Sequence, residues 1–198
     1  MHIDILSVTI RGGLTALRSP IEVAVAAVKD YVENHPYSML YICRNYSRVL
    51  DHLDGDFDVR RAFTAYQLFS ILEDVYQDVM FIEHDPLLFE DALGGKNGDE
   101  NGSGNKDRGR GSRDYSLAEN LSLAVKDVAR GRLIIYYSPF NDPFFNLIAK
   151  NSDRVLIFER EPSGYFIVDS GYSEGYRNRH RRFYHRFLPK GQTTLEVF

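Results

Sequence analysis

Four apolar residues stand in an unbroken run within residues 78–83, Asp-Val-Met-Phe-Ile-Glu. Two more runs of this kind occur at residues 38–43 and at Leu133–Tyr137. Strands buried on both faces have continuous apolar sequences, whereas strands with one wet face alternate apolar and polar residues. The three runs therefore predict buried strands of a mostly parallel central sheet.

Helical periodicity separates these runs. Apolar side chains recur every three or four residues within residues 21–34, 59–76 and 115–130, and a shorter helix is expected at residues 142–150. Residues 3–10 are rich in β-branched side chains and predict a first strand. This alternation predicts an α/β fold of three layers, with a mostly parallel sheet and helices on both of its faces.

An antiparallel hairpin is expected at one edge of the sheet, where a turn at residues 161–164 joins Arg154–Phe158 to Tyr165–Val168. Residues 94–113 contain seven glycines and no apolar side chain, which predicts a mobile insertion. The strand–helix rhythm resumes after this insertion. Residues 1–198 are therefore expected to form a single domain that ends in a basic segment, residues 176–198.

Composition limits the location and the partners of the chain. Its formal net charge is −4, so attraction to nucleic acid would have to come from a local basic patch. Cys43 is the only cysteine, which favours a reducing compartment, and we expect a cytoplasmic protein. We see no signal peptide and no apolar run near the ~20 residues that span a bilayer, so no membrane partner is expected.

The order of elements resembles the RecA-like recombinase and KaiC-like ATPase superfamily over about residues 3–170. Proteins of that superfamily have a strand, a phosphate loop, a helix, further strands and helices with an acidic residue after one strand, and a late edge hairpin. The segment Ser152-Asp153-Arg154-Val155 and the hairpin after it are similar to the late strand pair of the superfamily. The resemblance implies a RecA-like fold.

The phosphate loop of this superfamily has the pattern G-x-x-x-x-G-K-[ST]. The matching residues, 12–19, read Gly-Gly-Leu-Thr-Ala-Leu-Arg-Ser, with leucine for the second glycine and arginine for the lysine. The resemblance implies a degenerate nucleotide site made by Gly12, Gly13, Arg18 and Ser19. An ordinary turn between a strand and a capped helix remains the alternative.

The helix after this segment has sequence features of a self-capped start. Ser19 is expected to cap the helix, Pro20 suits the first helical position, and Glu22 completes a capping box. A helix start that satisfies its own N–H groups has less need of a phosphate. This feature favours a binding module over an enzyme.

An acidic residue after a buried strand positions the water on Mg²⁺ in this superfamily. Glu83 directly follows the run at residues 79–82, and Asp85 is two residues further on. The resemblance implies that these two carboxylates would be the catalytic residues if the protein were active. Their alternative role is ordinary loop polarity after the strand.

Two segments carry a surplus of basic residues, one within the predicted insertion and one at residues 176–190. The C-terminal segment interleaves arginines with tyrosine and phenylalanine, the residue types that contact phosphates and stack on bases of single-stranded nucleic acid. The alternative is a terminal element that packs its aromatic residues on the core and leaves its arginines in water. The candidate nucleic-acid-binding residues are Lys106, Arg108, Arg110, Arg113, Arg177, Arg179, Arg181, Arg182 and Arg186.

These features together predict a non-catalytic RecA-fold paralog that acts as an accessory or regulatory subunit of the recombination or repair type. Its expected partners are single-stranded nucleic acid, a RecA-like homologue or a second copy of the chain. ATP and Mg²⁺ are not expected cofactors. No metal site is expected either, because His180 and His185 are five residues apart, a poor helical spacing for joint metal ligation. Two alternatives stay open: an ATP-binding or ATP-hydrolysing enzyme in which Asn141 senses the γ-phosphate, and a protein–protein scaffold with an aromatic surface.

Overall fold

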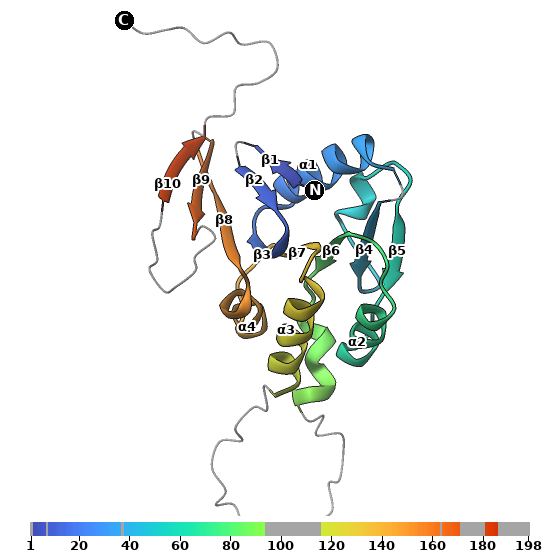
Figure 1. The fold of residues 1–198 in the computed structure, drawn as a ribbon. Helices are drawn as coiled ribbons and strands as arrows, with labels where there is room; N and C mark the ends of the chain where they lie inside the picture. The colour runs from blue at the N-terminus through green and yellow to red at the C-terminus, as the bar shows by residue number, and fades with distance from the viewer. Residues whose placement is uncertain are drawn as a thin grey trace, which may run out of the picture.

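The computed structural model describes residues 2–6, 8–36, 38–93, 116–162, 164–170 and 181–185. Figure 1 shows an α/β fold built around one large sheet. The helices are α1 (Ile21–Asn34), α2 (Ala65–Glu73), α3 (Ser116–Val128) and α4 (Pro143–Asn151), with short 3-10 helices η1 (Leu50–His52) and η2 (Pro86–Leu93). The strands are β1 (His2–Ile5), β2 (Val8–Arg11), β3 (Gly13–Arg18), β4 (Met39–Cys43), β5 (Asp58–Arg61), β6 (Val79–Glu83), β7 (Leu133–Ser138), β8 (Arg154–Glu161), β9 (Gly164–Asp169) and β10 (Arg181–His185).

The large sheet has eight strands in the order β10-β9-β8-β3-β7-β6-β4-β5. The six strands from β8 to β5 are parallel, and β9 and β10 continue the sheet as antiparallel strands at one edge. The predicted mostly parallel sheet and its antiparallel edge hairpin are confirmed. The apolar runs at β4, β6 and β7 are buried along almost their whole length, as their sequences predict.

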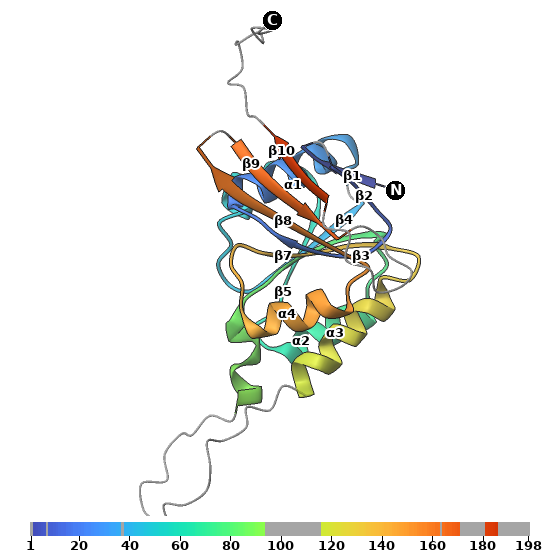
Figure 2. The ribbon, with the colours of Figure 1, turned by 90° about the vertical axis from the view of Figure 1, so that its left-hand side faces the viewer.

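Two hydrophobic layers cover the sheet, one on each face. Figure 2 shows α2, α3 and α4 on one side of the sheet and α1 with the β1–β2 hairpin on the other. The amphipathic helices bury their apolar stripes here, so the predicted three-layer arrangement is confirmed. None of the described helices is long and apolar enough to cross a membrane.

Three predicted elements differ from the structure. Residues 3–10 form a two-stranded antiparallel hairpin rather than one strand, because the chain reverses at Leu6, which has a positive φ of 55°. The central strand of the fold is β3, in the segment predicted to be a phosphate loop. The helix predicted at residues 59–76 is shorter, since residues 58–61 form the edge strand β5 and α2 begins only after the Thr64 cap.

At the middle of the sheet, two neighbouring strands connect to helices on opposite faces. β3 continues into α1, which lies on one face, while its neighbour β7 continues into α4 on the other face. A crevice forms at the carboxyl ends of two adjacent strands whose connections leave in opposite directions, and α/β proteins bind ligands there. The carboxyl ends of β3 and β7 are therefore the place to look for a site.

Candidate nucleotide site

A cavity of about 460 Å³ opens at this switch point. The β3–α1 connection, the β7–α4 connection and the end of β8 supply its walls. Arg18, Asn141 and Arg160 bring polar groups to the cavity, and Phe140 and Phe158 bring aromatic surface. The other lining residues are Ser19, Pro20, Pro139 and Glu159.

The connection between β3 and α1 consists of only Ser19 and Pro20. The predicted loop at residues 12–19 is wrong in position, because residues 13–18 are the central strand and pair with both β7 and β8. Leu14, Ala16 and Leu17 are fully buried there, which explains why this segment cannot be a surface loop. Of the four predicted nucleotide-site residues, only Arg18 and Ser19 lie at the cavity.

Gly12 and Gly13 lie at the opposite, amino end of β3. Gly13 has a φ of +100°, and a Cβ atom there would stand 2.7 Å from Oδ2 of Asp153. That carboxylate oxygen accepts a hydrogen bond of 2.8 Å from the backbone N–H of Leu14 and the other oxygen pairs with Lys126. The glycine therefore allows a close approach of Asp153 and does not serve a phosphate at the cavity.

The predicted capping box at the start of α1 is not formed. Pro20 is the N-cap residue, and no side chain of the described residues caps the helix. The Ser19 hydroxyl donates to the Pro20 carbonyl at 3.1 Å, and Glu22 accepts a hydrogen bond from the Tyr165 hydroxyl at 2.8 Å. Both side chains are turned to other partners, so the argument that this helix start satisfies itself is wrong.

Two ion pairs connect β8 to β3 and to α1, and the β8 residues of both pairs line the cavity. Arg18 Nη2 lies 2.7 Å from Oε1 of Glu159, and Arg160 lies 3.5 Å from Glu22. Burial, together with its hydrogen bond to Glu22, raises the pKa of Tyr165 to about 12. The guanidinium of Arg18, which the resemblance assigns to phosphate, already has a carboxylate partner of its own.

Glu83 and Asp85, the carboxylates that would be catalytic if the protein were active, lie at the end of β6 and just after it, outside the residues that line the cavity. Glu83 Oε2 accepts a hydrogen bond of 2.8 Å from the Tyr41 hydroxyl, and burial raises the pKa of its carboxyl group. Asp85 lies 3.7 Å from Arg44 and accepts a hydrogen bond of 2.9 Å from the backbone N–H of Leu87. Among the described residues, no cluster of three or more histidine, cysteine, aspartate or glutamate side chains is arranged to hold a metal ion.

Comparisons with known proteins agree with the architecture. No family model matches the chain. A curated "Uncharacterized protein" of Archaeoglobus fulgidus is 35% identical over 196 residues, which are 99% of this chain and 88% of that protein. The chain belongs to the family of this archaeal protein.

The solved structures with a similar fold include the flagellar accessory protein FlaH from Methanocaldococcus jannaschii. It has a TM-score of 0.52 and 11% sequence identity, over 85% of this chain and 84% of that one. A KaiC-like protein from Pyrococcus horikoshii has a TM-score of 0.49 and 12% identity, over 88% and 85% of the two chains. The likeness to FlaH shows the fold alone.

Seven of the nine predicted nucleic-acid-binding residues lie outside the described part of the chain. Lys106, Arg108, Arg110 and Arg113 fall in the predicted insertion, and Arg177, Arg179 and Arg186 flank β10. Arg181 and Arg182 belong to β10, whose backbone pairs with Asp169 and Val168 of β9. Their role stays a prediction.

The sequence analysis did not identify a buried hydrogen-bond network around His84, which lies near the cavity. His84, which follows β6, has Nδ1 2.9 Å from the Tyr136 hydroxyl and Nε2 2.6 Å from Asp142 Oδ2. Asp142 also caps α4 by accepting from the N–H of Phe145 at 2.8 Å. Burial tends to raise the pKa of Asp142, but the hydrogen bond and charge of His84 outweigh it and lower this pKa. The Asp142-Pro143 cap signal was visible in the sequence, whereas its histidine partner lies 58 residues earlier.

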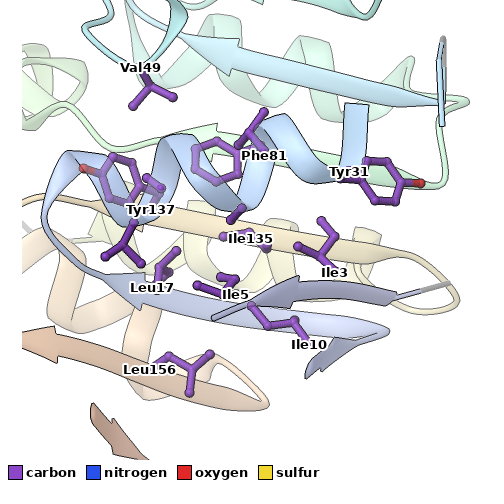
Figure 3. Close-up of a cluster of buried hydrophobic side chains, with 14 of the residues drawn as sticks. Ile3, Ile5, Ile10, Leu17, Tyr31, Val49, Phe81, Ile135, Tyr137 and Leu156 are labelled. Carbon is purple, nitrogen blue, oxygen red and sulfur yellow. The ribbon is translucent and has the colours of Figure 1, made fainter. Parts of the chain in front are cut away.

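Tyr137 of β7 is a second residue that the sequence did not single out. Figure 3 shows it among the buried side chains, together with Leu17 of β3 and Phe81 of β6. Its hydroxyl is buried and has no hydrogen-bond partner among the described residues. Burial raises the pKa of this hydroxyl, and the nearby charges of Glu83 and Glu22 raise it further.

Proposed function

We propose that this protein is a non-catalytic RecA-fold subunit that works by binding nucleic acid or a catalytic homologue. The observation that carries the proposal is the two-residue connection, Ser19-Pro20, between β3 and α1. A phosphate loop of the superfamily pattern uses several residues between strand and helix, so that consecutive backbone N–H groups surround the phosphates. Two residues are too few for this arrangement, and Pro20 has no N–H to donate.

The charges around the cavity support the same conclusion. Arg18 forms a close pair with Glu159, so binding a phosphate would break that pair and bring an anion next to a carboxylate. Glu83 is partly buried and already accepts a hydrogen bond from the Tyr41 hydroxyl, so this oxygen is not free to bind Mg²⁺. The residues present at the switch point therefore fit ATP and Mg²⁺ poorly.

Isothermal titration calorimetry of the full chain with ATP and Mg²⁺ tests the non-catalytic half of the proposal. We expect no binding at low micromolar nucleotide concentration, because the charge-assisted hydrogen bonds of a phosphate loop, about 1.5–3 kcal/mol each, are missing. The matched control is Arg18→Ala. Tight ATP binding that disappears in this variant would overturn the proposal.

A fluorescence anisotropy titration with labelled single-stranded DNA tests the binding half. Contacts between arginines and phosphates release counterions, so affinity should fall steeply as salt concentration rises. The Arg181→Ala/Arg182→Ala variant should bind more weakly and show a smaller salt slope. An affinity that does not change with salt, or no binding at low salt, would remove nucleic acid from the proposal and leave the protein partner.

A second candidate function is an ATP-binding enzyme with an unorthodox loop, and the cavity favours it. Arg18, Ser19 and Asn141 all line a space of about 460 Å³ at the switch point. Mg²⁺-dependent ATP hydrolysis that is lost in Glu83→Gln would support this enzyme. The absence of hydrolysis in the unaltered protein would reject it.

A further inference from the structure

The edge strand β5 and the segment that follows it have exposed apolar side chains that the proposed function does not use. In Figure 1, β5 lies at the edge of the sheet opposite to β10. Val59 on β5 is 41% exposed, Phe63 just after it 44%, Tyr66 in the first turn of α2 63%, and Tyr76 after α2 71%. The Tyr76 hydroxyl donates to Asp58 of β5 at 2.9 Å, which holds this aromatic ring beside the strand.

The backbone of β5 is open on one side. Within the described part of the chain it pairs with β4 alone, in parallel register, with Tyr41 beside Val59 and Ile42 beside Arg60. An edge strand presents N–H and C=O groups that can pair with another strand. Exposed aromatic residues beside such an edge mark it as an interaction surface rather than a protected end of the sheet.

The charges on β5 select a second copy of this chain as the occupant. Asp58 and Arg60 are two residues apart, so they point to the same face of the sheet, while Val59 between them points to the other. In an antiparallel pair of two β5 strands centred on Val59, each Asp58 stands opposite the other copy's Arg60. Opposite charges facing each other across a strand pair are stabilising.

The other two-fold registers within this triplet are unfavourable. A pair centred on Asp58 or on Arg60 would place two like charges directly opposite each other, which is destabilising. A shift by one residue would turn the apolar and charged side chains to the wrong faces. The sequence Asp-Val-Arg is thus complementary to itself in a single register, as the shared patch of a two-fold dimer must be.

The existing contacts of both charged residues leave room for this pairing. Tyr76 and Gln77 both donate to Oδ2 of Asp58, so Oδ1 has no donor among the described residues. Arg60 has an ion pair of 3.4 Å to Asp74, whose side chain is 85% exposed. Such an exposed pair contributes little and exchanges readily for a better one.

We propose that two copies of this chain associate through antiparallel pairing of their β5 strands, centred on Val59, into one continuous sheet. Val59 then meets Val59 of the second copy on the two-fold axis, and Phe63, Tyr66 and Tyr76 extend the contact beyond the short strands. This association uses the edge of the sheet far from β8 and β10. It stands whether or not the protein binds nucleotide or nucleic acid.

Disulfide trapping of Val59→Cys in the full chain tests the register directly. Residues opposite each other on an antiparallel pair have Cα atoms about 4.5–5.5 Å apart, which a disulfide bridges without strain. Under a mild oxidant this variant should form a covalent dimer. Leu123→Cys on α3 is the matched control, since Leu123 is also exposed but lies outside the proposed interface, and it should stay monomeric.

Sedimentation equilibrium with charge variants tests the complementarity. The unaltered chain should reach twice its monomer mass of 22.8 kDa with rising concentration. Arg60→Glu should raise the dimer dissociation constant about tenfold or more, because two attractive pairs become repulsive. Asp58→Lys should do the same, and an equimolar mixture of the two variants should regain association, since each charge then meets its opposite.

Three results would overturn the proposal. The first is a chain that remains monomeric at every concentration, and the second is Val59→Cys that crosslinks no more than Leu123→Cys. The third is a dimer that Arg60→Glu leaves unchanged, which would place the interface elsewhere. If Asp58→Lys does not fold by circular dichroism because it loses its bonds to Tyr76 and Gln77, the trapping experiment and Arg60→Glu still decide the question.

Discussion

An acidic side chain contacts each end of β3, Asp153 at the amino end and Glu159 of β8 at the carboxyl end, but only the carboxyl end borders a cavity. At the amino end, Asp153 accepts from the N–H of Leu14 and fills the position where Gly13 has no side chain. At the carboxyl end, Glu159 meets Arg18 at the rim of a cavity of about 460 Å³. The amino end is therefore tightly packed, whereas the carboxyl end is open and has space for a ligand.

Gly13→Ala should break the packed end and have the largest effect. The new methyl group would overlap Asp153 and would force alanine into a positive φ, so we expect a loss of about 2–4 kcal/mol in the free energy of unfolding. Urea denaturation measures this loss. Gly12→Ala is the control, because a Cβ there meets only the Arg132 carbonyl at 3.4 Å. Equal effects of the two substitutions would contradict the role of Asp153.

Asp142→Asn should have an intermediate effect at the open end. Asparagine keeps the α4 cap but loses the charged hydrogen bond to His84, so we expect a loss of about 1.5–3 kcal/mol at neutral pH. The pKa of Asp142 is lowered in the folded state, so the stability it contributes is complete above the unfolded pKa and disappears as pH falls through the folded one.

Thermal unfolding of Asp142→Asn and the unaltered protein across acidic pH checks this linkage. The difference between the two should be largest near neutral pH and should shrink as pH falls below the ordinary aspartate range. A difference that grows on acidification would show that the folded-state pKa of Asp142 is raised instead. His84→Gln is a useful companion, since it removes the partner and should flatten the same pH dependence.

Arg18→Ala should have the smallest effect on stability. Its pair with Glu159 is partly exposed, so we expect a loss of less than about 1 kcal/mol, reduced further at high salt. Urea denaturation at two salt concentrations measures it. A larger and salt-independent loss would mean that the carboxyl end is as tightly packed as the amino end. This result would weaken the contrast between the two ends.

The sequence predicted the buried strands best, because burial on both faces produces a continuous apolar run that is visible locally in the sequence. The runs that became β4, β6 and β7 are apolar because both faces of those strands are covered, and the late hairpin has a clear turn between its strands. β5 was missed because the helix predicted at residues 59–76 included most of this strand. An edge strand with one covered face has too few apolar residues to reveal itself.

The site was predicted less well, because its geometry depends on residues distant in sequence. Gly12 and Gly13 looked like loop glycines, yet Gly13 is fixed by Asp153, which is 140 positions later in the chain. The same two glycines hid the central strand that begins at Gly13. Ser19 and Glu22 matched a capping box, but Tyr165 of β9 takes the Glu22 side chain. Local pattern alone cannot show such competition between partners.

The position of β3 has a consequence for how the chain folds while it is being synthesised. β3 lies at the centre of the sheet, but the ribosome makes its partner strands more than a hundred residues later, since Gly13 pairs with Leu133 and Thr15 with Arg154. Until residue 138 leaves the ribosome, Leu14, Ala16 and Leu17 have no neighbouring strand. Sheets closed by such distant pairings fold slowly and expose apolar surface while they wait. A nascent chain of this protein therefore carries the apolar side chains of β3 without neighbouring strands until β7 and β8 have been made.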